Sequence, residues 1–205
     1  MRLTLQTFLS IDGVMQAPGG PDEDPEGGFA HGGWSFVYGD EDFGNTVAGW
    51  FTGASAFLLG RRTYEIFSSY WPKVTDPDNP IATKLNALPK YVASTTLPSL
   101  EWEGASLLTG DVVEQVRELK ERPGDELQVH GSGGLAQTLI GHDLVDEYRL
   151  FTFPVHLGAG KKLFRDGLRG AALRLTGVSS TSSGVITATY VPDGDLRPGS
   201  YVAPD

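Results

Sequence analysis

The sequence predicts a single α/β domain in which a mixed, mostly parallel sheet carries helices on both faces and antiparallel strands at its C-terminal end. Short apolar runs, typical of buried strands, alternate along most of the chain with segments of helical periodicity. The last two strand-like segments, Ala172 to Val178 and Val185 to Val191, follow each other without a helix and therefore form an antiparallel edge. The 205 residues fit one domain over residues 1–191 and a tail over 192–205.

The first third of the chain predicts two strands, two helices and a long loop. A strand over Leu3 to Leu9 leads into a loop from about Gln16 to Gly39, which is rich in glycine and proline yet carries four aromatic residues. Such a loop is either a lid that packs over a site or a surface insertion. A helix is expected over Asp42 to Phe51, then a buried strand over Ala56 to Leu59, and a second helix that begins near Arg61.

The rest of the chain repeats the alternation of strand and helix. Asp111, with Glu114 three residues later, predicts the capped start of a helix whose buried face includes Val113 and Val116. The other expected elements are a short helix between Pro80 and Pro89, a buried strand at Tyr91 to Ala93, a short strand ending at Leu107-Leu108, a strand at Leu127 to His130, a helix ending near Ile140 and a strand at Glu147 to Phe153.

Composition excludes several classes of function. A net charge of −10 and a pI near 4.8 argue against nucleic acid as a partner. The chain has no cysteine, and its four histidines lack the spacing of metal ligands, so no metal is expected. No apolar run is long enough to cross a membrane, and the N-terminus does not resemble a signal peptide, so the sequence predicts a cytoplasmic protein.

Three strand ends carry residues that could bind a ligand, because ligands of open α/β sheets bind at the carboxyl ends of the strands. Gly60-Arg61-Arg62-Thr63 opens a helix and would suit a phosphate; the alternative is a pair of exposed arginines at a helix start. Ser94-Thr95 could hold a phosphate or form a turn. His130-Gly131-Ser132-Gly133-Gly134 is the strongest candidate, because closely spaced glycines let a phosphate approach the backbone.

Familiar nucleotide and hydrolase signatures do not fit this chain. Ala136 stands where G-x-G-x-x-G requires its last glycine, and the next strand ends without the acidic residue of the dinucleotide fold. The run Gly158 to Lys162 lacks the first glycine and the final hydroxyl of a P-loop. His130 occupies a glycine position of the nucleophile elbow G-x-S-x-G, which makes an esterase triad improbable.

Taken together, four motifs resemble the dihydrofolate reductase-like family, in order and in spacing. They are Ser10-Ile11-Asp12-Gly13, Leu59-Gly60-Arg61-Arg62-Thr63-Tyr64-Glu65, Val92-Ala93-Ser94-Thr95 and Val129-His130-Gly131-Ser132-Gly133-Gly134-Leu135. The later run Leu157 to Phe164 is similar to the riboflavin-biosynthesis reductase (RibD C-terminal) branch. The resemblance covers residues 1–191 and implies a dihydrofolate reductase-like three-layer sandwich.

The resemblance also implies an NADPH-dependent reductase that transfers a hydride to a C=N or C=O group of a small heterocycle, such as a pterin or an aminopyrimidine. A protein that holds NADPH without turnover, such as a sensor, is the alternative. The residues implied in cofactor binding are Gly13, Gly60, Arg61, Arg62, Thr63, Ser94, Thr95, Gly131, Ser132, Gly133, Gly134 and Leu135. The two arginines and two hydroxyls, with no acidic residue expected beside them, predict a preference for NADPH over NADH.

The substrate side rests on fewer residues. Asp12 is the implied catalytic residue, and its alternative role is to form the turn before Gly13. The carboxylate that dihydrofolate reductases carry on the first helix has no clean match, since Asp40, Glu41 and Asp42 lie just upstream of its position. Trp50, Phe51, Phe151 and Phe153 line the substrate pocket or belong to the core. The unpaired edge of the two late strands predicts a homodimer.

Overall fold

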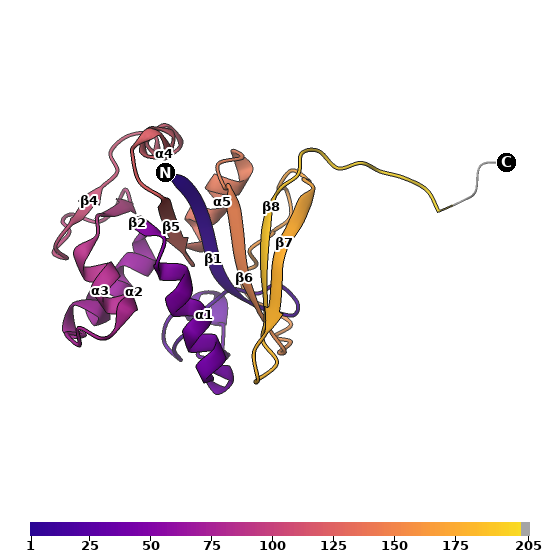
Figure 1. Ribbon diagram of the computed structural model, residues 1–205, viewed down its shortest axis with the longest axis horizontal. Coiled ribbons are helices and arrows are strands. Elements are labelled where there is room, and N and C mark those ends of the chain that lie inside the picture. Colours follow the sequence, from indigo (N-terminus) through magenta and orange to yellow (C-terminus); the bar gives the residue numbers. More distant parts are fainter. Residues whose placement is uncertain (202–205) are drawn as a thin grey trace.

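The computed structural model describes residues 1–201, in which eight strands form one sheet in the order β4-β3-β2-β5-β1-β6-β8-β7 (Figure 1). The strands from β4 through β6 in this order run parallel to one another, and β8 is antiparallel to both β6 and β7. This confirms the predicted mixed sheet with antiparallel C-terminal strands. The bounds are β1 Arg2–Ser10, β2 Ala54–Gly60, β3 Lys90–Ala93, β4 Ala105–Leu107, β5 Glu126–His130, β6 Glu147–Phe153, β7 Leu173–Ser180 and β8 Ile186–Pro192.

Helices cover both faces of the sheet, so the fold has three layers. One apolar cluster packs the first three helices against side chains such as Phe57 and Leu59 of β2. A second cluster packs the last two helices against the opposite face, around Leu58, Leu127 and Val129. The bounds are α1 Glu41–Phe51, α2 Arg61–Tyr70, α3 Pro80–Ala87, α4 Val112–Glu121 and α5 Gly133–Gly141. As predicted, the Asp111 carboxylate caps α4, accepting from the N–H of Val113 at 2.8 Å.

Strand β5 shows why one face of the sheet is apolar and the other partly polar. Because successive side chains point to opposite faces, Leu127 and Val129 enter the core beneath α4 and α5. Glu126, Gln128 and His130 therefore point to the face that α1 covers. Buried polar groups need partners, and those of this row are described with the site below.

The long loop after β1 packs on the domain. It contains two short 3-10 helices, η1 Glu26–Gly28 and η2 Phe36–Tyr38. Trp34 is 9% exposed, donates from Nε1 to the carbonyl of Gln16 at 2.7 Å and meets Phe153 edge to face. The loop is therefore held against the sheet by its own aromatic residues, which agrees with a covering element rather than a peripheral insertion.

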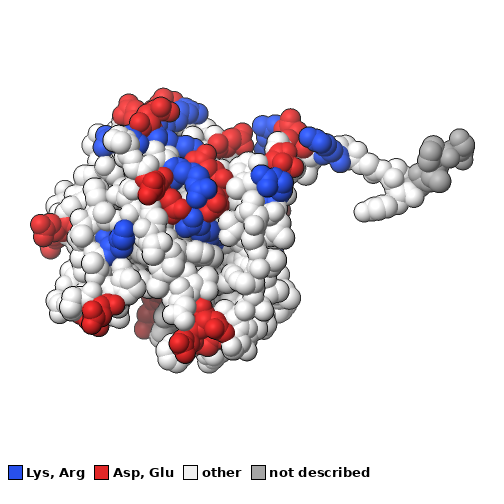
Figure 2. Space-filling view, viewed as in Figure 1, with Lys and Arg blue, Asp and Glu red and all other residues white. Residues whose placement is uncertain are grey.

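The C-terminal part of the described chain leaves the sheet after β8 (Figure 1). The predicted tail begins at Pro192, the last residue of β8, and residues 193–201 contain no helix or strand. Positions 202–205 of that tail lie outside the described residues. Within residues 1–201, no helix has the length and apolar character needed to span a membrane. Figure 2 shows Lys and Arg interspersed with Asp and Glu over the upper part of one face.

Candidate active site

A cleft of about 1190 Å³ lies at the carboxyl ends of β2, β3 and β5. The structure thus brings the three predicted strand ends together. Of the residues predicted to bind the cofactor, those that line the cleft are Gly60, Arg61, Arg62, Thr63, Ser94, Thr95, Gly131, Ser132, Gly133, Gly134 and Leu135. Of the residues predicted to bind the substrate, Trp50, Phe51 and Phe151 line it.

Two helix N-termini, those of α2 and α5, face this cleft without a side-chain cap. In the same described chain α1, α3 and α4 are capped by Asp40, Asn79 and Asp111. By contrast, no side chain caps α2 or α5. Free N–H groups and the positive end of the helix dipole suit an anion such as a phosphate. The two uncapped helix starts therefore give one end of the cleft free N–H donors that suit an anion.

Hydrogen bonds between the two helix starts explain why α5 has no cap. Ser132 stands at the N-cap position with φ 52°, but its hydroxyl accepts from the N–H of Gly60 at 3.0 Å and donates to the carbonyl of His130 at 2.9 Å. The N–H of Ser132 donates in turn to Thr63 Oγ1 at 3.1 Å. Ser132 thus joins α2 to α5 and leaves the first turn of α5 open toward the cleft.

The other end of the cleft is aromatic. Trp50 and Phe151 lie with their ring centroids 4.4 Å apart, and the ring of Phe51 stacks on the imidazole of His130 at 4.6 Å. Val47 and Phe67 also line this end. An apolar pocket with few polar groups is typical of a site for a flat ring.

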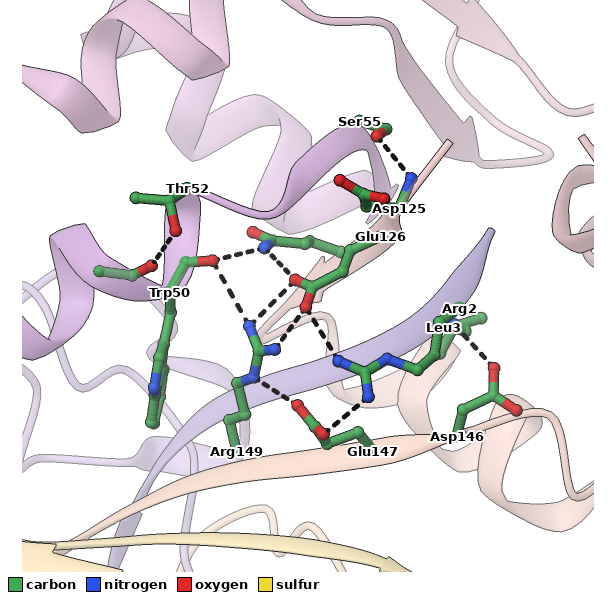
Figure 3. Close-up of polar contacts among 12 residues, drawn as sticks. Arg2, Leu3, Trp50, Thr52, Ser55, Asp125, Glu126, Asp146, Glu147 and Arg149 are labelled. Carbon is green, nitrogen blue, oxygen red and sulfur yellow. Dashed lines mark hydrogen bonds and ion pairs between the residues drawn. The ribbon is translucent and has the colours of Figure 1, made fainter. Parts of the chain in front are cut away.

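Beneath the aromatic end, buried charges meet on the sheet face that α1 covers (Figure 3). Arg149 donates from Nε to Glu147 at 2.7 Å and contacts both carboxylate oxygens of Glu126. Arg2 pairs with the same two carboxylates at 3.2 Å and 3.1 Å. Arg149 also donates to the carbonyl of Trp50 at 3.4 Å. The network therefore ties the C-terminal end of α1, with its aromatic residues, to strands β5 and β6.

His130 lies between this network and the cleft. Burial and the nearby charge of Arg149 lower the pKa of its imidazole to about 3. The ring is therefore neutral at neutral pH, and His130 cannot serve there as a proton donor in the imidazolium form.

The loop after β1 supplies charges at the end of the cleft where α2 and α5 begin, which is called the phosphate end below. The Asp24 carboxylate forms ion pairs with Arg62 and with Lys161, the latter at 2.7 Å. The Glu26 carboxylate pairs with the same two side chains, at 3.3 Å and 2.6 Å respectively. The expectation that no acidic residue stands beside the arginines is therefore wrong for both, since Arg61 also pairs with Glu65 of its own helix at 3.3 Å. Asp24 is 38 positions away from Arg62 in sequence, and only the closure of the loop over the cleft brings it there.

Asp12 lies in the turn after β1 and is not among the residues that line the cleft. Its carboxylate accepts from the Ser10 hydroxyl at 2.7 Å and from the N–H groups of Leu157 at 3.2 Å and Gly158 at 2.9 Å. These bonds, that of Ser10 first, hold the pKa of Asp12 well below its ordinary value. The placement corresponds to the turn-forming alternative.

Two other predicted site residues also lie away from the cleft lining. Gly13, with φ 81°, turns the chain after Asp12, and Phe153 is fully buried among Phe8, Trp34 and Phe43. The Asp40 carboxylate accepts from the N–H of Ser183 at 2.6 Å, and the Asp42 carboxylate accepts from the N–H of Ser182, both in the turn before β8.

The sequence did not single out Gln6, Gln16, Asp24 or Lys161 as site residues, although all four line the cleft. Gln6 stands in a strand where polar and apolar residues alternate, so no local pattern distinguished it.

Comparisons with known proteins agree with this architecture. A family model described as the RibD C-terminal domain matches residues 2–187. The chain is 30% identical over 195 residues to the uncharacterized protein YyaP of Bacillus subtilis (strain 168), covering 92% of this chain and 94% of that protein.

Two solved structures show the same fold. A protein from Shewanella sp. PV-4 that is named for riboflavin biosynthesis has a TM-score of 0.66 and 20% identity, with 94% of this chain and 99% of that one covered. Dihydrofolate reductase from Enterococcus faecalis, complexed with NADP(H), has a TM-score of 0.59 and 12% identity, with 94% and 96% covered.

Proposed function

Because the chain belongs to the RibD C-terminal domain family, we propose that it is an NADPH-dependent reductase of a small heterocyclic substrate. The observation that carries the proposal is one cleft with two uncapped helix starts at one end and an aromatic pocket at the other. A dinucleotide needs such a division, since its phosphates seek N–H groups and cations while its nicotinamide must meet a flat substrate. The complex of the E. faecalis reductase with NADP(H) supports a nicotinamide cofactor.

The residues at the phosphate end fit this cofactor. The open first turn of α5, with Gly133 and Gly134, would hold the pyrophosphate, and a side chain built at Gly134 would meet nothing within 4 Å. Arg61, Ser94 and Thr95 would hold the 2′-phosphate of the adenosine. Ser94 Oγ already accepts from the N–H of Leu97 at 3.1 Å, which leaves its proton free to donate to a phosphate oxygen.

When bound, NADPH supplies the hydride, which would pass to a C=N or C=O carbon of the substrate. The chain's own task is to position the two rings and to keep bulk water away. Trp50, Phe51 and Phe151 would hold the substrate ring, and the loop after β1 would cover it. Since His130 is neutral and the Asp12 carboxylate is engaged in its turn, the proton would reach the product from water.

The alternative is a protein that binds NADPH without turning it over. Titration with NADPH, followed by its oxidation in the presence of a panel of pterins, aminopyrimidines and cyclic imines, separates the two. Saturable binding with steady oxidation supports the reductase, whereas binding without oxidation supports the sensor. Failure to bind NADPH at all would rule out both.

Strand β7 lies at the edge of the sheet with all eight residues exposed, and a second copy that covers it would make a homodimer. A cytoplasmic location remains a prediction from the sequence.

A further inference from the structure

Gln6 is a buried polar residue at the cleft for which the proposed reaction gives no role. Its side chain is 5% exposed and lines the cleft, yet the carboxamide nitrogen has no hydrogen-bond partner among the described residues. Its backbone carbonyl is satisfied by the N–H of Gly131 at 3.0 Å. A buried donor without an acceptor destabilises a protein and calls for an explanation, and a ligand that accepts from it is one.

His130, the neighbour of Gln6 on β5, has a tautomer that the surrounding hydrogen bonds fix. The Gln128 amide nitrogen donates to the carbonyl of Trp50 at 2.6 Å and to the Glu126 carboxylate at 2.7 Å. A flipped amide would place its oxygen against these two acceptors, so the oxygen of Gln128 faces Nε2 of His130, 3.1 Å away. His130 must therefore donate from Nε2.

Because the imidazole is neutral near pH 7, a proton on Nε2 leaves Nδ1 as a bare acceptor. No hydrogen bond to Nδ1 is present in the described part of the chain. The network of Glu126, Gln128 and Arg149 thus leaves Nδ1 of His130 able to accept a hydrogen bond from a ligand.

The two side chains belong to one end of the cleft. Gln6 and His130 are partners in the register of β1 and β5, so their side chains share the sheet face that α1 covers. Phe51 stacks on the His130 ring, and Phe151 lines the same end. The acidic residues of the cleft lining are Asp22, Glu23 and Asp24, all on the loop and none on this floor.

This proposal rests on the proposed function: we propose that Gln6 and His130 are specificity-determining residues that recognise one edge of an uncharged substrate ring by hydrogen bonds. The amide nitrogen of Gln6 is itself buried, so the carboxamide rotates to donate from this nitrogen to a ring carbonyl oxygen. Nδ1 of His130 accepts from the neighbouring ring N–H. This pattern selects a lactam edge, in which a ring N–H stands beside a C=O.

The test uses two probes and needs no turnover. Pteridine-2,4-dione carries ring N–H groups beside carbonyls, and its 1,3-dimethyl derivative keeps the carbonyls but has lost those N–H donors. Binding of each to the full chain is followed by the fluorescence of the probe, with and without saturating NADP⁺. Imidazole ¹⁵N NMR of the wild-type protein, assigned with His130→Phe, reports the tautomer and the state of Nδ1.

We expect the dione to bind about tenfold more tightly than the dimethyl probe, since the latter lacks the donor to His130. The dione should shift the Nδ1 resonance of His130, and Nε2 should stay protonated from pH 5 to 8. Gln6→Leu should weaken binding of the dione roughly three- to tenfold without lowering the unfolding midpoint, because it removes an unsatisfied donor.

Thr4→Val is the matched control. Thr4 Oγ1 is likewise buried without a partner and lies on the same strand and face, but Thr4 does not line the cleft. This variant should bind both probes as the wild type does. Equal affinity for the two probes, failure of both to bind, an unmoved Nδ1 resonance at saturation, or a Gln6→Leu variant that binds the dione normally would overturn the proposal. If the probes bind as expected but the protein does not bind NADPH, the proposed reductase function is wrong.

Discussion

At the scale of single residues, the two arginines that open α2 differ in what already holds them. Arg61 contacts Glu65 on its own helix at 3.3 Å, a half-exposed pair of little energetic value. Arg62 is held by Asp24 and Glu26 of the loop. Arg61 is therefore the arginine available to a phosphate, while Arg62 holds the loop closed.

Replacing the two arginines should separate these tasks. Arg61→Ala should weaken NADPH binding about ten- to a hundredfold, the value of one charge-assisted contact, and leave NADH binding almost unchanged. Arg62→Ala should reduce the preference for NADPH less than Arg61→Ala does, but it should make the loop over residues 16–39 easier to cleave with protease. Titrations of both cofactors, with limited proteolysis, check this. Equal wild-type affinity for NADH and NADPH would remove the 2′-phosphate assignment.

The Asp12 carboxylate should contribute stability that depends on pH. Its folded pKa lies well below the ordinary value of 3.8, because the Ser10 hydroxyl and two backbone N–H groups hydrogen-bond the charged form. The contribution is thus complete above about pH 5 and disappears as pH falls from about 4 toward the folded pKa. Asp12→Asn should lower the free energy of unfolding at pH 7 by about 1–3 kcal/mol, with a smaller difference at pH 3.

Urea unfolding of both proteins between pH 3 and 7 measures that difference. If Asp12 acts on the substrate instead, as predicted from the resemblance, turnover should fall while stability and NADPH binding stay near the wild-type values. Parallel losses of stability and turnover would favour the turn-forming role.

At the scale of elements, the uncapped start of α5 links helix stability to ligand binding. Gly134 is the second residue of α5, and its open surroundings admit a side chain. An acidic residue in the first turn stabilises a helix by about 0.3–1 kcal/mol, but here it would place a negative charge where the cofactor's pyrophosphate is proposed to bind.

Gly134→Asp should therefore raise the unfolding midpoint and weaken NADPH binding about tenfold or more. Gly134→Asn, of nearly equal size and without the charge, is the matched control and should bind more tightly than the aspartate variant. Thermal unfolding and NADPH titration of both variants provide the measurement. Identical affinities of the two variants would show that no anion binds at this helix start.

At the scale of the whole molecule, strands β7 and β8 expose apolar side chains beside an unpaired edge. Leu175, Val178 and Ile186 are 47%, 64% and 48% exposed. The pairings of Leu175 with Tyr190 and of Val178 with Ala188 place them on one face of the sheet. Burying this face against a second copy would remove apolar surface from water and cover the edge.

Val178→Glu should convert the proposed dimer to monomer at micromolar concentration. Ser179→Glu places the same charge on the opposite face of β7 and should leave the dimer intact. Sedimentation of the three proteins checks this. A wild-type protein that sediments only as monomer would contradict the dimer.

The sequence by itself determined the order of elements and the edge at which the site lies. Apolar runs, helical periodicity, a helix cap and bracketing prolines predicted the strands and the α-helices, because all of these are local properties of the chain. Since parallel strands end at the same edge of a sheet, the residues after β2, β3 and β5 had to meet there. Gly60 to Thr63, Ser94-Thr95 and Gly131 to Leu135 accordingly share one cleft.

Only the tertiary structure decided which partners each side chain of the site has. Asp12 meets Leu157 and Gly158, about 145 positions away, and this pairing holds its carboxylate outside the cleft lining. The closure of the loop places Asp24 on Arg62, and the register of β1 with β5 sets Gln6 beside His130. Such contacts depend on strand order and register, which long-range packing sets, and no local pattern in the chain encodes them.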